Sequence, residues 1–180
     1  MRYHAVIDTN MIVSGVLPSR PDSPPKRIME SIINGRIVPI HSRYLLGEYR
    51  GVLQRDKFRL DGNDVDILVG FLESVGVSVE PETCDYALPD PKDSPIYAVM
   101  MSSAEYNPYL VTGNIRHFPE TEKIVTPKEM MDILDADDGR TGPGDTGARP
   151  RGMDAGAVRH GSLTPFYIRV PPLRGHGKEA

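Results

Sequence analysis

The chain has 180 residues, of which 39% are hydrophobic, and this is enough for one ordinary domain with its own core. No run of about 18 apolar residues is present, and the opening MRYHAVIDTN lacks the order of charged, apolar and small residues typical of a secretory signal. We therefore expect a cytoplasmic protein with no membrane contact. The single cysteine, Cys84, excludes an internal disulfide and a zinc site made of several cysteines.

The first half of the chain alternates predicted strands and helices. YHAVID is a short apolar run that ends in an aspartate, which indicates a buried strand. A helix is expected in SPPKRIMESIING, with Ser23 as the cap and Gly35 as the stop. The brief strand RIVPI follows, and SRYLLGEYRGVLQRDKF then predicts a helix capped by Ser42.

The alternation continues in the second half. A helix is expected from about Gly62 to Val75, closed by Gly76, and VSVEP predicts a strand after it. A further helix is predicted from about Asp93 to Glu105, then the strands YLVTG and EKIVT, and a last helix that begins with PKEMMDIL. Such alternation favours an α/β layer fold around a mostly parallel sheet, whose active sites gather at the carboxyl ends of the strands.

Composition changes near residue 136. Residues 136–180 contain nine glycines and five prolines and show no helical periodicity, so we predict a domain over residues 1–135 and a flexible, disordered tail over residues 136–180. The apolar stretch Leu163–Leu173 could add a strand to the domain or to a partner, although an unstructured segment is the simpler interpretation.

Four acidic residues stand where the predicted elements change. Asp8 ends the first strand, Asp90 and Asp93 precede a helix, and Glu48 lies at the border of a helical apolar stripe. Asp8 and Asp93 are also good helix N-caps, and Glu48 could pair with a neighbouring arginine such as Arg43 or Arg55, so each has a structural interpretation. Taken together, carboxylates at one edge of a sheet predict a site for a hard divalent cation, Mg²⁺ or Mn²⁺, that serves phosphodiester hydrolysis.

The segment VTGNIRHF adds neutral donors to the same edge. Thr112, Asn114 and His117 follow a predicted strand, and Gly113 allows a close approach of the backbone. His117 could bind a metal, act as a general acid or contact phosphate, whereas most loop histidines do none of these.

A basic stretch offers a candidate surface for phosphates. Between Arg20 and Arg59 the chain has nine basic residues against four acidic ones, although solvated helix faces would explain the same pattern. The candidate RNA contacts within this stretch are Arg43, Arg50, Arg55 and Lys57.

The order of these pieces resembles the PIN-domain ribonucleases, and more closely their branch of toxin components of toxin–antitoxin pairs. The resemblance rests on VIDTNMIVSGVL, SRYLLGEYRGVLQRDKF, DPKDSPIYAVMMSSAEYNPYLVTGN and IVTPKEMMDIL, which lie within residues 3–134. It implies a three-layer α/β/α sandwich and a magnesium-dependent endoribonuclease. It also implies an RNA substrate, an antitoxin partner and a homodimer.

The resemblance also assigns roles to individual residues. Asp8, Glu48 and Asp93 match the acidic triad that holds the metal, and Asp90 is a possible auxiliary ligand. Thr9 and Asn10 match polar residues that orient the first aspartate. Asn114 stands where many members have a fourth aspartate, and His117 stands where a further acid is common. The amide of Asn114 lowers the negative charge of the site, which puts a second metal ion in question.

Two other functions fit the same residues. A non-catalytic relative would keep the fold as an RNA-binding or protein-binding module with a metal site weakened by Asn114. A phosphatase would use Asp8 as its nucleophile, but the second acid and the phosphate-gripping lysine that this chemistry needs are not evident beside the sequence DTN.

Overall fold

A computed structural model describes residues 1–17, 20–83 and 85–140 of the chain. The predictions for Cys84 and for Leu163–Leu173 lie outside the described residues. The same holds for the predicted tail from residue 141 onward.

The centre of the fold is a parallel sheet in the order β3-β2-β1-β4-β5. Each pairing in the sheet is parallel, so the prediction of a mostly parallel sheet is confirmed. Val6 in the central strand is paired with Ile40 on one side and with Leu110 on the other. The strands are β1 Tyr3–Ile7, β2 Ile37–His41, β3 Val77–Ser78, β4 Tyr109–Val111 and β5 Ile124–Val125.

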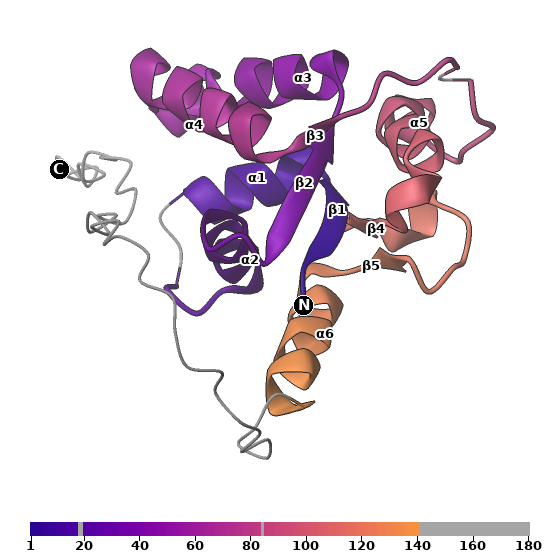
Figure 1. Ribbon diagram of the computed structural model, residues 1–180. Coiled ribbons are helices and arrows are strands. Elements are labelled where there is room, and N and C mark those ends of the chain that lie inside the picture. Colours follow the sequence, from indigo (N-terminus) through magenta and orange to yellow (C-terminus); the bar gives the residue numbers. More distant parts are fainter. Residues whose placement is uncertain (18–19, 84, 141–180) are drawn as a thin grey trace, which may run out of the picture.

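Helices cover both faces of this sheet and complete three layers. In Figure 1, α2 lies on one side of β2, and α5 lies on the other side of the sheet, near β1 and β4. The predicted α/β/α sandwich is therefore confirmed. The helices are α1 Thr9–Val16, α2 Pro24–Ile33, α3 Arg43–Leu53, α4 Gly62–Val75, α5 Ser94–Ser102 and α6 Pro127–Arg140.

The core lies where the sheet meets these helices. Val6 and Leu110 in the central strands are fully buried, and so are Leu53 of α3 and Leu134 of α6. Parallel strands with helices on both faces have no solvent side, which explains why β1 reads as a continuous apolar run. Burial of these aliphatic side chains is the main term that stabilises the layers.

Local differences from the sequence predictions have simple causes. Ser42 caps α3 through its side chain, as predicted, whereas Ser23 makes no side-chain capping hydrogen bond to α2. Pro25 occupies the second position of α2 and has no N–H, so one of the two usual donors to such a cap is missing. Gly35 has a φ of +69°, which accounts for the stop after α2.

The end of one predicted helix also differs. The helix α5 ends at Ser102 and a 3₁₀ turn, Ala104–Tyr106, replaces its predicted last turn. The last helix, α6, runs to Arg140 and so continues past residue 135, where the composition places the end of the domain. No helix within the described residues is long and apolar enough to cross a membrane.

Candidate metal centre

Asp8 lies at the point where the strand order reverses. The chain runs from β1 to β2 and β3 on one side and returns to β4 on the other, so the carboxyl ends of β1 and β4 lie at the kind of switch point where open α/β sheets bind ligands. The backbone N–H of Asp8 donates to the carbonyl of Val111 at 2.9 Å, which fixes the residue against the end of β4. Asp8 also occupies the N-cap of α1, so its structural role is confirmed.

Both oxygens of the Asp8 carboxylate accept hydrogen bonds. Oδ1 accepts from the backbone N–H of Asn10 at 3.0 Å, and Oδ2 accepts from the hydroxyl of Thr112 at 2.6 Å. The Thr112 hydroxyl in turn accepts from the backbone N–H of Asn114 at 3.1 Å. Because an ionised carboxylate has about four lone-pair sites, these two bonds orient Asp8 and leave oxygen positions for a cation.

Glu48 is held near the same edge by a threonine. The hydroxyl of Thr9, which is buried at 6% exposure, donates to Oε1 of Glu48 at 2.9 Å. Glu48 is half-buried on α3, so the expectation that it borders the apolar stripe is confirmed. Asp8, Thr9, Glu48 and Thr112 are called the strand-end cluster below.

The charges of both acids of the strand-end cluster act on the side chain of Tyr49. Its hydroxyl donates to the carbonyl of Ile7, at the end of β1. Burial raises the pKa of Tyr49 well above its ordinary value, and the negative charges of Asp8 and Glu48 raise it further. The phenol therefore stays neutral and ties α3 to the strand that carries Asp8.

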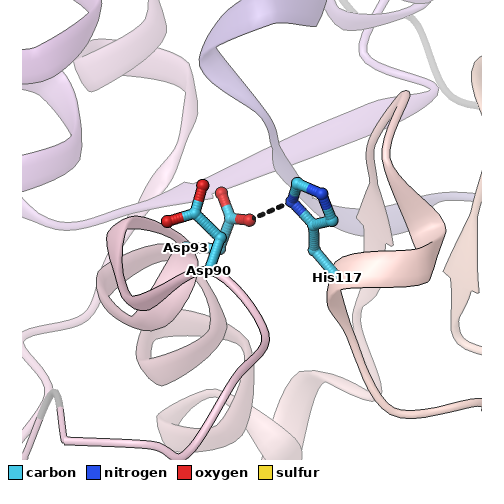
Figure 2. A group of neighbouring side chains, drawn as sticks. All are labelled: Asp90, Asp93 and His117. Atoms are coloured by element: carbon cyan, nitrogen blue, oxygen red, sulfur yellow. Dashed lines mark hydrogen bonds and ion pairs between the residues drawn. The ribbon is translucent and has the colours of Figure 1, made fainter.

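A second group of ligand-type side chains lies at the mouth of α5. Candidate ligand atoms of Asp90, Asp93 and His117 are all within 4.8 Å of one another, and the three residues are half-buried. Figure 2 shows the imidazole of His117 turned toward the two carboxylates. Its Nδ1 lies 2.7 Å from Oδ2 of Asp93. These three residues are called the loop cluster below.

The loop cluster changes the expected role of Asp93. Asp93 occupies the N-cap position of α5, but its side chain makes no capping hydrogen bond, so the predicted cap through the carboxylate is wrong. His117 engages that carboxylate instead. Asp90 is the side chain that caps, since its Oδ1 accepts from the backbone N–H of Lys92 at the start of a 3₁₀ turn, Pro91–Asp93.

The structure thus brings the predicted acids together as two sets. Asp8 and Glu48 belong to the strand-end cluster and are not part of the group formed by Asp90, Asp93 and His117. The elements that carry the two sets are packed together, because α5, which begins directly after Asp93, contacts both β1 and α3.

The predicted auxiliary residues have different contacts from those expected. The Thr9 hydroxyl donates to Glu48, so the side chains that orient Asp8 are not those of the Thr9–Asn10 pair. Asn10 contributes through its backbone N–H, and the oriented hydroxyl comes from Thr112. Asn114 is exposed at the start of the 3₁₀ turn Ile115–His117, with its backbone N–H held by Thr112.

The basic residues predicted to contact RNA differ in whether their side chains already have a partner in the fold. Arg50 forms an ion pair with Asp66 of α4, Nε to Oδ1 at 2.8 Å, which links α3 to α4. The ammonium of Lys57 lies 4.7 Å from the ring centre of Phe58. Arg43 and Arg55 are exposed. The alternative that Glu48 pairs with Arg43 or Arg55 is wrong, since its partner is Thr9.

The comparison with protein families agrees with this geometry. A family model described as a PIN domain matches residues 4–116, which is more than half of the chain and includes every residue of the strand-end cluster and the carboxylates of the loop cluster. The chain belongs to the PIN-domain family. A search of curated proteins found no significant match.

PIN domains are generally nucleases and typically use divalent metals. The donor set of this PIN domain fits such an ion, because carboxylate oxygens are the ligands that Mg²⁺ and Mn²⁺ prefer.

One participant was not identified from the sequence. In the sequence, Tyr49 is only one residue of an apolar helix face. In the structure, its hydroxyl joins α3 to the carbonyl of Ile7. The available signal is its position next to Glu48, because an amphipathic phenol beside a boundary carboxylate needs a partner for its hydroxyl when it is buried.

Proposed function

We propose that this PIN domain is a metal-dependent endoribonuclease that hydrolyses RNA phosphodiester bonds. The observation that carries the proposal is the Asp8 carboxylate, fixed by the hydroxyl of Thr112 at the carboxyl ends of β1 and β4. A preorganised carboxylate at this position is what a catalytic divalent ion requires, since its ligands must already be in place when substrate binds.

Asp8, Glu48 and Asp93 are the proposed ligands, with Mg²⁺ or Mn²⁺ as the ion. A bound divalent ion would supply a Lewis acid that polarises the phosphodiester and activates water. Thr112 and Thr9 hold the first two carboxylates in position. Asp90 and His117 are auxiliary residues that flank Asp93.

Asn114 has a positioning role in this proposal. It is exposed next to Thr112, and its amide can both donate and accept a hydrogen bond. We place it as the group that orients water for in-line attack on the phosphorus. An amide in place of a fourth carboxylate leaves the site with less negative charge, which favours a single divalent ion.

RNA would be held by basic side chains of α3 and of the segment that follows it. Arg43, Arg55 and Lys57 are exposed on α3 or just after it, and α3 also carries Glu48. Arg50 contributes less in this proposal, because its guanidinium already pairs with Asp66. Phosphate contacts of this kind position the substrate without reading its sequence.

The biological role that we propose is that of a toxin in a toxin–antitoxin pair, active as a homodimer in the cytoplasm and inhibited by a partner protein. The support is the resemblance of the chain to that branch of the family. Co-expression with the product of a neighbouring small reading frame, followed by co-purification, tests this part separately.

The test of the enzymatic proposal is an RNA-cleavage assay with purified protein. Wild-type protein with Mg²⁺ or Mn²⁺ should cleave single-stranded RNA, and EDTA should abolish the cleavage. Asp8→Asn and Asp93→Asn should lose activity by several orders of magnitude while their circular dichroism and melting temperatures stay close to those of the wild type. Asp64→Asn, an acid on α4 outside both clusters, is the matched control and should remain active.

A second candidate function is a catalytically weakened RNA-binding or protein-binding module. The observation in its favour is that Asp93 already has a partner in His117 and that an amide stands at Asn114. This module would bind RNA without cleaving it at any concentration of Mg²⁺ or Mn²⁺. The cleavage assay separates the two functions directly.

A further inference from the structure

A hollow of about 390 Å³ lies in the connection between β4 and β5. Its apolar lining includes Phe118 and Ile124, both buried, and the exposed side chain of Ile115. Two charged residues of opposite sign, Arg116 and Glu120, complete the rim. The volume is in the lower part of the range of small-molecule sites, which suits a single flat ring system.

The hollow shares its wall with the loop cluster. Ile115, Arg116 and His117 form one turn of 3₁₀ helix, in which three residues complete a turn and point in three directions. His117 is directed to Asp93, while the other two line the hollow. On the far wall, the ring of Phe118 lies 6.1 Å from that of Tyr97 in α5, the helix that begins directly after Asp93.

The two rim charges are available to a ligand. Within the described residues, neither the guanidinium of Arg116 nor the carboxylate of Glu120 has an ion-pair or hydrogen-bond partner, and both residues are exposed. An exposed guanidinium can hold a phosphate or lie flat on a base, and a carboxylate with two free oxygens accepts two parallel N–H donors.

We propose that this hollow binds one unpaired base of the RNA, next to the phosphodiester held at the metal centre, and that it prefers guanine. This proposal rests on the endoribonuclease function proposed above and adds the base that the enzyme prefers. Unpaired bases are recognised in proteins by apolar or aromatic surfaces and by hydrogen bonds to their Watson–Crick edges. Guanine is the base whose Watson–Crick edge offers two adjacent N–H donors, from N1 and N2, to the carboxylate of Glu120. Arg116 would hold the adjoining phosphate.

Binding of short oligoribonucleotides in EDTA tests the proposal without any need for cleavage. Four otherwise identical single strands would carry guanine, inosine, adenine or uracil at one central position, and fluorescence anisotropy would give their affinities for the full-length protein. We expect guanine to bind about tenfold more tightly than inosine, which lacks the N2 amino group, since a hydrogen bond to a charged acceptor is of this strength.

Variants at the rim test whether the preference for guanine depends on the hollow. Glu120→Gln should remove the difference between guanine and inosine, whereas Glu122→Gln, an exposed neighbour that does not line the hollow, should retain it. Arg116→Gln should weaken all four strands alike. A guanine preference that depends on Glu120 supports the hollow even if the protein cleaves no RNA. Equal affinity for the four strands, or the same loss in both glutamate variants, overturns it, whether or not RNA is cleaved.

Discussion

The hydroxyl of Thr112 donates to Oδ2 of Asp8 at 2.6 Å, across the two strands where the sheet reverses its order. Thr112 is fully buried whereas Asp8 is half-buried, so this bond is partly shielded from water. The bond joins residues 104 positions apart in the sequence. The strand-end cluster therefore forms only when the pairing of the strands brings these residues together.

Thr112→Val tests this bond. The substitution keeps the shape but leaves the Asn114 N–H and one oxygen of Asp8 without their partner, and we expect the free energy of unfolding to fall by about 1–3 kcal/mol. RNA cleavage should fall at least tenfold, because the carboxylate is no longer held. Thr112→Ser, which retains the hydroxyl, should lose much less activity and a much smaller part of the free energy of unfolding. Urea unfolding measures the latter. Wild-type activity in the valine variant would contradict the orienting role.

Alkaline titration tests the position of Tyr49. Burial and the charges of Asp8 and Glu48 raise its pKa in the folded state, so the unfolded chain loses this proton first, above pH about 10. The stabilisation is therefore present below pH 10 and is lost as the pH rises further.

Tyr49→Phe should make the free energy of unfolding less dependent on pH above 10, at a cost of about 1 kcal/mol at neutral pH for the lost hydrogen bond. Urea unfolding at several alkaline pH values measures this, with exposed Tyr44→Phe as the control. Identical pH profiles for the wild type and Tyr49→Phe would show that Tyr49 is not the group involved.

The buried position of His41 predicts that the free energy of unfolding falls in acid. This histidine is buried at the end of β2, and burial lowers the pKa of His41 below its ordinary 6.5, while the Glu73 carbonyl and the charges of Glu73 and Glu80 act in the opposite direction. Below pH 6.5 the unfolded chain binds a proton at His41 that the folded chain does not, so the free energy of unfolding falls as the pH decreases from 6.5 to the folded pKa.

The measurement for His41 is urea unfolding on both sides of pH 6.5. His41→Gln should flatten the dependence, and His4→Gln, in the half-exposed part of β1, is the matched control that should preserve it. A wild-type stability that stays constant through this range would rule out a neutral, buried His41.

Arg50 and Arg55 should differ in their effects on RNA binding. Arg50 is paired with Asp66, whereas Arg55 is exposed just after α3. Arg55→Gln should weaken RNA binding and reduce the magnitude of the slope of log affinity against log salt by about 1, the value for one phosphate contact. Arg50→Gln should change that slope less and lower stability by no more than about 1 kcal/mol, as is usual for exposed ion pairs. Equal salt slopes for Arg55→Gln and wild type would remove Arg55 from the RNA surface.

Much of this fold could be predicted because its signals are local. The apolar run Tyr3–Ile7 and the cap at Ser42 depend on nearby residues, and both are in place. The position of Asp8 at the end of β1 follows from the rule that parallel strands present their carboxyl ends at one edge.

Side-chain partners were harder to predict, because they are fixed by contacts between distant segments. The bond from Thr9 to Glu48 spans 39 positions, and the pairing of His117 with Asp93 spans 24. Sequence spacing gives no direction for these side chains. The same limit explains why Asp93 was expected to cap a helix and why the hollow beside His117 was not foreseen.

The central claim is that carboxylates of the strand-end cluster and of the loop cluster share one divalent ion. Calorimetric titration with Mn²⁺ tests it on wild type, Asp8→Asn, Glu48→Gln and Asp93→Asn, each with its fold checked by circular dichroism. The account predicts one Mn²⁺ per chain and an affinity at least tenfold lower in every variant. Wild-type affinity in Asp8→Asn and Glu48→Gln, with loss only in Asp93→Asn, would contradict it and confine the ion to Asp90, Asp93 and His117.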